Sequence, residues 1–150
     1  MSPTFLAILA MLTFCVGTVV GLRDKTLIQT KALPNGAAST VTDGFDLETA
    51  SGEFLADVEL ELDVPALTST EVADTQTITY IVETSATSGF GSVTTLLTVQ
   101  TVTGSSGVAA LNRRIRLPST IQRYVRVKAT KTGASNASTS SMTVSLLTLG

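Results

Sequence analysis

The sequence contains no histidine and no tryptophan, only two tyrosines, and a single cysteine, Cys15. A chain without histidine lacks the most common general base and metal ligand, and it cannot form the Ser-His-Asp arrangement of many hydrolases. A single cysteine cannot form an internal disulfide or a cysteine-rich zinc site. The few aromatic residues leave little with which to stack a sugar or a nucleic-acid base. We therefore expect no enzyme activity, no metal, no cofactor and no small-molecule substrate.

Charge of one sign is missing from long parts of the chain. Residues 32–112 contain eleven acids and no base, and residues 113–150 contain seven bases and no acid. The net charge is only −2, which gives no reason to expect a nucleic-acid partner. The basic segment is too short for a separate β-domain. We therefore expect the basic C-terminal strands to lie beside acidic middle strands, within a subunit or between subunits. The alternative is two separate solvated faces of opposite sign.

Threonine and serine dominate what is present, with 26 and 15 residues, and this composition favours strands and turns. The clearest strand is Phe54–Val64, whose even positions are all apolar while four of its odd positions are acidic. This period of two is typical of a strand with one buried and one solvent-exposed face. Four like charges on one face repel each other unless cations lie opposite them. The bases near the C-terminus are the expected partners.

Seven further segments have the composition or alternation of strands, and turn-forming residues separate them. They are residues 27–31, 41–48, 77–83, 93–102, 109–117, 121–130 and 142–149. Eight short strands with no amphipathic helix between them predict an all-β fold, an antiparallel β-sandwich of the jelly-roll kind. An immunoglobulin-like sandwich is the alternative, although such domains usually contain a core tryptophan and paired cysteines.

The strand pattern begins near Leu22, and residues 22–150 have a suitable length for one sandwich domain. Residues 1–21 are set apart by the uncharged stretch Phe5–Leu22. Three interpretations of this stretch stay open: a poor signal or membrane anchor, a buried or partner-binding arm, and an over-extended gene start. Two basic residues follow the apolar stretch and none precedes it, which is the wrong order for an ordinary signal peptide.

The acids of Phe54–Val64 are the only acid–base candidates, and the basic cluster is the only candidate for binding phosphate. Successive acids on one strand face lie about 7 Å apart, a spacing like that of glycosidase carboxylate pairs. A salt-bridged strand face explains the same acids without a catalytic role. Calcium loops place their ligands on a glycine-containing turn, and the sequence has no such loop. Only Tyr124 is interleaved with the bases, so pairing with the acids explains them better than nucleic-acid binding.

Two stretches carry a family resemblance. The first is Leu22–Ile28 (LRDKTLI), followed by small residues and the acidic segment Asp46–Glu48. The second runs from Arg116-Leu117-Pro118 to Arg123–Thr130 (RYVRVKAT). In this order they resemble the capsid cement, or decoration, proteins of tailed bacteriophages, in particular the group typified by the Bordetella phage cement protein. The resemblance covers roughly residues 22–150.

The resemblance implies a jelly-roll-like fold, homo-oligomers (dimers or trimers) on the outside of the phage head, and no enzyme activity. It implies the major capsid protein as partner, and a virion location after assembly in the host cytoplasm. A cytoplasmic capsid protein needs no secretion signal, which favours the over-extended start. The competing expectation is a secreted or membrane-anchored adhesive β-domain that uses Phe5–Leu22 for targeting.

We expect oligomer or capsid contacts at the charged residues of the two regions. These residues are Asp57, Glu59, Glu61, Asp63, Arg114, Arg116, Arg123, Arg126 and Lys128. Charge reversal at Arg126 or Lys128 is expected to leave the isolated fold nearly intact while weakening assembly. Reversal at Glu61 should restore part of that loss if the groups are neighbours.

Overall fold

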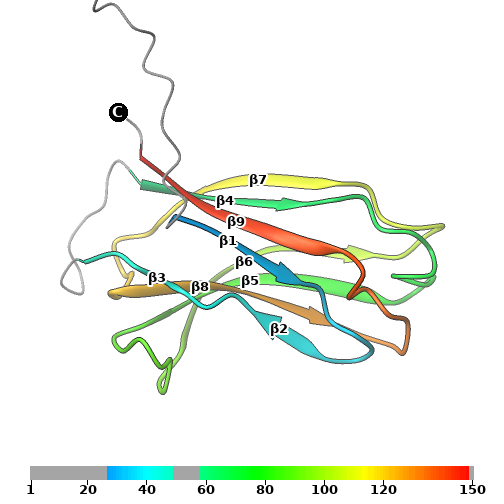
Figure 1. Cartoon of the computed structure of the whole chain (residues 1–150), viewed down its shortest axis with the longest axis horizontal. Coiled ribbons are helices and arrows are strands. Elements are labelled where there is room, and N and C mark those ends of the chain that lie inside the picture. The colour runs from blue at the N-terminus through cyan, green and yellow to red at the C-terminus, as the bar shows by residue number, and fades with distance from the viewer. Residues whose placement is uncertain (1–26, 49–57, 149–150) are drawn as a thin grey trace, which may run out of the picture.

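The structure is a computed structural model that describes residues 27–48 and 58–148. These residues form strands, turns and loops, with no α-helix among them. Figure 1 shows two layers of strands stacked face to face. The nine strands are β1 (Ile28–Ala32), β2 (Ser39–Val41), β3 (Phe45–Asp46), β4 (Val58–Val64), β5 (Thr77–Ser85), β6 (Thr94–Thr103), β7 (Leu111–Arg116), β8 (Tyr124–Lys131) and β9 (Ser141–Thr148).

The strand pairings describe one long nested hairpin. β5 pairs with β6, β4 with β7, β2 and β3 with β8, and β1 with β9, all antiparallel. Two further pairings, β4 with β9 and β5 with β8, wrap this hairpin into two sheets of order β1-β9-β4-β7 and β2-β8-β5-β6. This is the jelly-roll arrangement, so the predicted sandwich is confirmed and the immunoglobulin-like order is not the one adopted.

The core lies between the two sheets and is built by the alternation seen in the sequence. In β4 the side chains of Leu60, Leu62 and Val64 are buried, and Val58 is half-buried. In the facing sheet, β5 and β8 supply alternating buried residues with the same period of two. The predicted apolar face of Phe54–Val64 is therefore confirmed from Val58 onward, and its first four residues lie outside the described part.

The predicted strand 41–48 is divided into β2 and β3 by the side chain of Thr42. Thr42 donates its backbone N–H to the Val127 carbonyl (3.0 Å), and its side-chain hydroxyl accepts the Val127 N–H (3.1 Å). The hydroxyl oxygen therefore accepts the hydrogen bond that a backbone carbonyl would accept in a regular strand pair. Gly44 then adopts φ +101°, and a Cβ atom there would lie 2.6 Å from a ring carbon of Phe90. The Gln29 amide pairs with the Gly44 backbone through two hydrogen bonds and links β1 to the second sheet.

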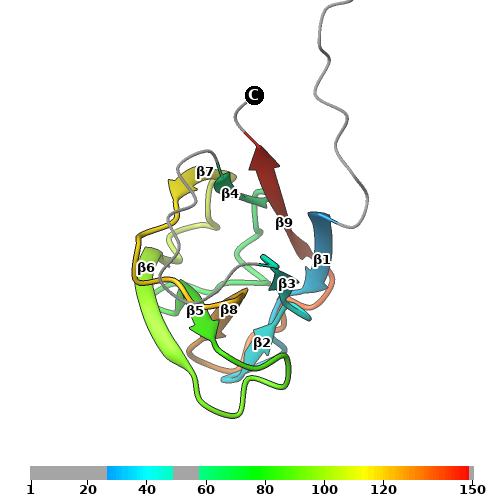
Figure 2. The ribbon, with the colours of Figure 1, turned by 90° about the vertical axis from the view of Figure 1, so that its left-hand side faces the viewer.

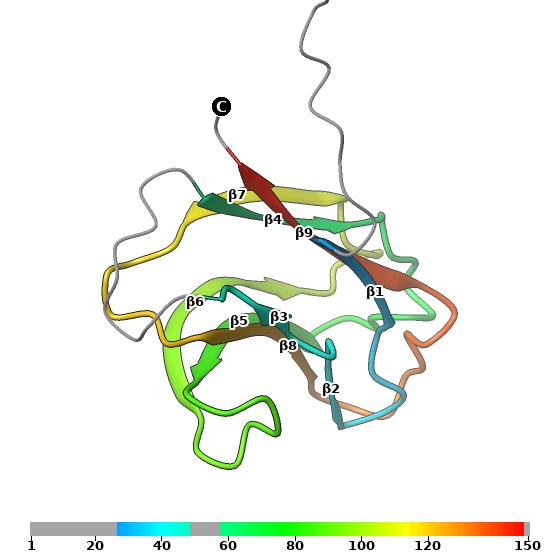
Figure 3. The ribbon, with the colours of Figure 1, turned by 60° about the vertical axis from the view of Figure 1, so that its left-hand side comes forward.

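The two ends of each sheet lie on opposite sides of the sandwich. Figure 2 shows β6 and β7 on one side, with β1, β2 and β3 on the other, and Figure 3 shows the two layers from an intermediate angle. Within residues 27–48 and 58–148 no helix is long and apolar enough to cross a membrane. The segment Phe5–Leu22 and the proposed division at residue 22 lie outside these residues, so both stay predictions.

Candidate interaction surfaces

The acids of β4 and the arginines of β7 form a cross-strand ladder on the outer face of the first sheet. Glu59 lies opposite Arg116, and Glu61 lies opposite Arg114. The Nε atoms of these arginines lie 3.5 Å from the Glu59 carboxylate and 3.3 Å from the Glu61 carboxylate, respectively. Acidic middle strands therefore do lie beside basic C-terminal strands, as predicted, and the alternative of separate solvated faces is wrong for these pairs.

The two partners in this ladder differ in exposure. The side chains of Glu59 and Glu61 are 16% and 9% exposed, whereas those of Arg116 and Arg114 are 76% and 57% exposed. The predicted solvent-exposed acidic face is therefore wrong at Glu61, which is covered by its neighbours. The carboxylates are used within the sheet, and the arginines remain available at the surface.

A second cluster lies on the outer face of the other sheet, where one carboxylate serves two cations. Glu83 of β5 contacts Arg126 at 2.8 Å and Lys128 at 3.6 Å, both on β8. The Arg126 guanidinium also lies over the Phe90 ring, 4.2 Å from its centroid. The Glu83 side chain is 7% exposed and that of Arg126 is 19% exposed. Arg126 is thus held between an anion and an aromatic ring.

The third charged contact joins β3 to the residue that precedes β8. The Arg123 guanidinium donates two hydrogen bonds of 2.8 Å to the two carboxylate oxygens of Asp46. Hydrogen bonding from Arg123, followed by the Glu48 N–H, lowers the pKa of Asp46 to about 2, and the carboxylate in turn raises the pKa of Arg123. The Arg123 guanidinium also lies 5.3 Å from the centroid of the Tyr124 ring.

The structure brings together only some of the nine predicted contact residues. Glu59 and Glu61 meet Arg116 and Arg114, and Asp63 lies opposite Asn112 in the register. Of the other three predicted bases, Arg123 contacts Asp46, and Arg126 and Lys128 both contact Glu83. The strand pattern did not single out either of these two acids. β4 and β8 belong to different sheets, so Glu61 is not a neighbour of Arg126 or Lys128. Asp57 lies outside the described residues.

Hydroxyl groups also pair across neighbouring strands on the outer surface. In the second sheet, one row across β2, β8, β5 and β6 consists of Ser39, Thr130, Thr79 and Thr101. The hydroxyl oxygens of Ser39 and Thr130 lie 2.8 Å apart, and those of Thr79 and Thr101 lie 3.0 Å apart. Such cross-strand pairs stabilise register by a few tenths of a kcal/mol each, up to about 1 kcal/mol.

A buried polar network joins the loops at one end of the sandwich, and nothing in the sequence pattern identified it. The Glu71 carboxylate accepts hydrogen bonds from the Thr68 N–H and from the hydroxyls of Thr68, Thr139 and Ser140. These donors, Ser140 first, lower its pKa to about 2. Lys131, also buried, donates to the Gln76 side chain and to two backbone carbonyls. Both charges are therefore satisfied within the fold.

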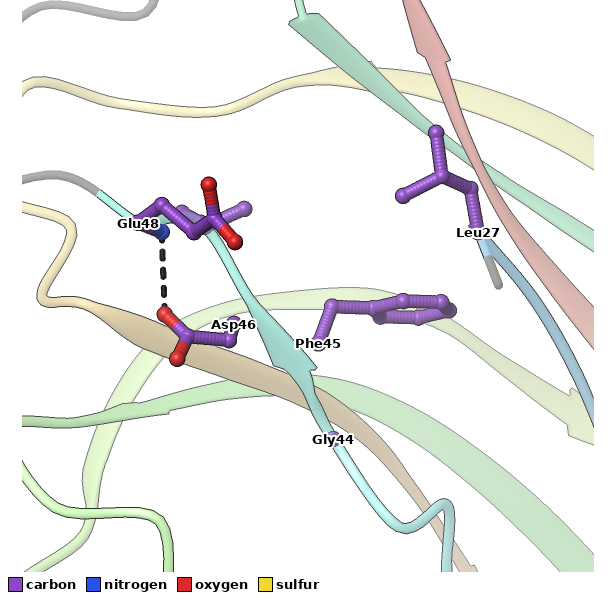
Figure 4. A pocket seen from close by; sticks show the side chains of 6 residues that line it. Leu27, Gly44, Phe45, Asp46 and Glu48 are labelled. Atoms are coloured by element: carbon purple, nitrogen blue, oxygen red, sulfur yellow. Dashed lines mark hydrogen bonds between the residues drawn. The ribbon is translucent and has the colours of Figure 1, made fainter. Parts of the chain in front are cut away.

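A hollow of about 510 Å³ opens beside β3, lined by Leu27, Gly44, Phe45, Asp46, Leu47 and Glu48. Figure 4 shows that Phe45 and Asp46 project to opposite sides of β3, as successive strand residues do. The Glu48 N–H donates to Asp46 Oδ1 at 2.9 Å. Leu27 and Glu48 of this lining are the first and last residues of the described range 27–48. Its lining combines the apolar side chains of Leu27, Phe45 and Leu47 with the carboxylates of Asp46 and Glu48.

Among the described residues, no three His, Cys, Asp or Glu side chains lie close enough to hold a metal ion. Comparison with protein-family models found no match, and comparison with curated protein sequences found none either. The fold and the charged surfaces are therefore the observations on which a function can be proposed.

Proposed function

We propose that this chain is a structural virion protein that binds the outer surface of a phage capsid and stabilises the expanded head by bridging capsomers. One observation carries the proposal. The stretch with the family resemblance, Arg123–Thr130, supplies all but the last residue of β8, which pairs with β2, β3 and β5 in a jelly roll. The chain thus has the fold that the resemblance implies, with the motif at its centre. Fold alone does not determine function, so the charged surface provides the second argument.

The exposed arginines of β7 are the proposed contacts with the capsid. Their carboxylate partners are mostly covered, so Arg114 and Arg116 can approach an acidic surface while keeping their positions in the sheet. A protein that binds only the expanded shell stabilises that shell by its binding free energy. Repetition over a lattice turns a modest contact into strong resistance to pressure.

The proposal is tested by purifying DNA-filled heads from a lysate of the phage or prophage that carries the gene. We expect the protein to sediment with the heads in stoichiometric copy number, and heads from a deletion strain to lose DNA at a lower temperature. Recovery in the membrane fraction or the medium, with none on the heads, would overturn the proposal. That result would support the adhesive domain, which the uncharged stretch Phe5–Leu22 favours.

The contact surface is tested with the double variant Arg114→Glu/Arg116→Glu, using Lys31→Glu as a matched control. Lys31 is also a partly exposed cation on an edge strand, but it lies in β1 on the other side of the sandwich. We expect the double variant to lower the copy number on heads, most strongly at low salt, where surface charges are least screened, and the control to leave it unchanged. Equal occupancy for all three proteins would exclude β7 as the capsid contact.

A further inference from the structure

Among the strands of the described residues, the two sheets end in four edges, formed by β1, β7, β6 and the pair β2 and β3. A free edge exposes unpaired backbone N–H and C=O groups and can pair with another chain. Three of these edges are protected in the usual way. β1 contains Lys31, β7 contains three arginines, and the remaining edge consists of strands of three and two residues with Asp46 at its end. Charged or short edges resist pairing with a second copy.

The fourth edge, β6, has neither of these protections. It is the longest strand, with ten residues, and among the described strands it pairs only with β5. No acid or base occurs between Glu83 and Arg113. This neutrality matters for self-association, because antiparallel pairing about a two-fold axis places the edge against the same edge of the second copy. An edge that carried lysine or arginine would place like charges opposite each other.

The second half of β6 has the regular backbone geometry that pairing with another strand requires. Val99 and Leu96 are each an extra residue opposite β5, so two bulges bend the first half of the strand. From Gln100 to Thr103 the register is regular. Beside this regular part lies a groove of about 430 Å³ between β6 and the start of β7. Facing β6 are Gly107, Val108, Ala109 and Ala110, followed by Leu111 and Arg113 of β7. The small side chains of the glycine and the two alanines leave room for an additional backbone.

We propose that two copies of this protein associate through antiparallel pairing of the Gln100–Thr103 edges of β6. Pairing of this kind continues the β2-β8-β5-β6 sheet across the two-fold axis and keeps outer faces on the same side. Thr101 and Thr103 both belong to the outer face, so Thr101 lies opposite Thr101 or Thr103 of the second copy. The hydroxyl row from Ser39 to Thr101 then continues into the second subunit.

This inference does not depend on the capsid proposal, because it concerns the isolated protein. A pairing of about four residues on each side gives an interface at the lower end of the specific range, for which dissociation constants of about 1–100 μM are expected. On a lattice the same contact would gain from the high local concentration of neighbouring copies. Failure of the capsid experiment would leave the dimer untouched, and a monomeric protein would leave the capsid experiment untouched.

The test is sedimentation equilibrium of the full chain, comparing Thr101→Lys/Thr103→Lys with Thr30→Lys. Thr30 is a matched control, because it is also an exposed threonine on an edge strand with a threonine opposite it, Thr143. We expect the wild type and Thr30→Lys to dimerise alike, and the lysine pair to raise the dissociation constant about tenfold or more by opposing like charges. A monomeric wild type, or equal dimerisation of all three proteins, would overturn the proposal.

Disulfide trapping gives an answer even if the lysine variant fails to fold. In a Cys15→Ser background, Thr101→Cys alone, or mixed with Thr103→Cys, should form a covalent dimer on mild oxidation, because directly paired strand residues lie within disulfide distance. Thr30→Cys in the same background should stay monomeric. Absence of the covalent dimer in both the single and the mixed samples, or equal trapping at Thr30, would refute the pairing.

Discussion

The contact between Glu83 and Arg126 allows a quantitative test of how the charges are arranged. Exposed ion pairs contribute about 0–1 kcal/mol, whereas removing one partner of a buried pair costs about 3–5 kcal/mol. The Glu83–Arg126 pair lies between these limits, because its side chains are 7% and 19% exposed and its atoms are 2.8 Å apart. We therefore expect a coupling energy of about 1–3 kcal/mol between the two side chains.

The measurement is a double-mutant cycle of Glu83→Gln and Arg126→Gln, followed by urea unfolding monitored by circular dichroism. Stacking of Arg126 on the Phe90 ring is lost in both Arg126 variants, so it cancels from the coupling energy. The retained Lys128 keeps part of its attraction to Glu83 in the Arg126 variant. The electrostatic part of the stability loss should therefore be larger for Glu83→Gln than for Arg126→Gln, because Glu83→Gln leaves both Arg126 and Lys128 without their carboxylate.

The control is the corresponding cycle between Glu61 and Arg126, which lie in different sheets. Their effects should add to within about 0.5 kcal/mol. A Glu83–Arg126 coupling below about 0.5 kcal/mol would refute the reasoning, and so would an equal coupling for Glu61 and Arg126. Because Arg126 is held within the fold, its charge reversal should destabilise the isolated protein. This replaces the expectation that the reversal would leave the fold nearly intact.

Three further perturbations have expected outcomes. In urea unfolding, Leu60→Ala should cost about 2–5 kcal/mol as a buried large-to-small change, whereas Glu59→Ala should cost about 1 kcal/mol or less. In thermal unfolding, Gly44→Ala should lower the midpoint because of its positive φ and the nearby ring, whereas Gly91→Ala, with open space around it, should change it little. The depressed pKa of Glu71 means that its ionised form stabilises the fold above about pH 4.5, and that this is lost as pH falls towards 2. Glu71→Gln should therefore weaken the acid dependence of stability in that range.

The sequence allowed prediction of the all-β class and of most strands, because half-buried strands alternate with a period of two. Within the described residues, β4 is the clearest case, since its buried leucines and its acids occupy opposite faces. The division of the segment 41–48 could not be predicted. It depends on hydrogen bonds between Thr42 and a residue of β8 that is 85 positions away in sequence.

The charged contacts were predictable in kind but not in partner. Segregation of acids and bases along the chain indicated pairing, and the arginines of β7 do meet the acids of β4. Which sheet each strand joins is decided by long-range wrapping, which sends β8 to the opposite layer from β4. The Glu71 and Lys131 network lies mainly in loops, where no periodic pattern marks a buried charge. Thr139 and Ser140, which donate to Glu71, and Gln76, which accepts from Lys131, are far from these charges in sequence and meet them only in the folded chain.

The nested hairpin also determines the order in which the protein can fold. The innermost pair, β5 and β6, is local, whereas β1 must find β9, and Thr30 and Thr143 are 113 positions apart. Closing such long loops carries a large entropy cost before any contact compensates for it, so folding should be slow for a domain of this size. On the ribosome β1 is made first of the nine strands, yet its neighbour in the sheet is made last. Its edge therefore stays open throughout synthesis, and a cell that makes many copies at once has to keep those edges apart until β9 arrives.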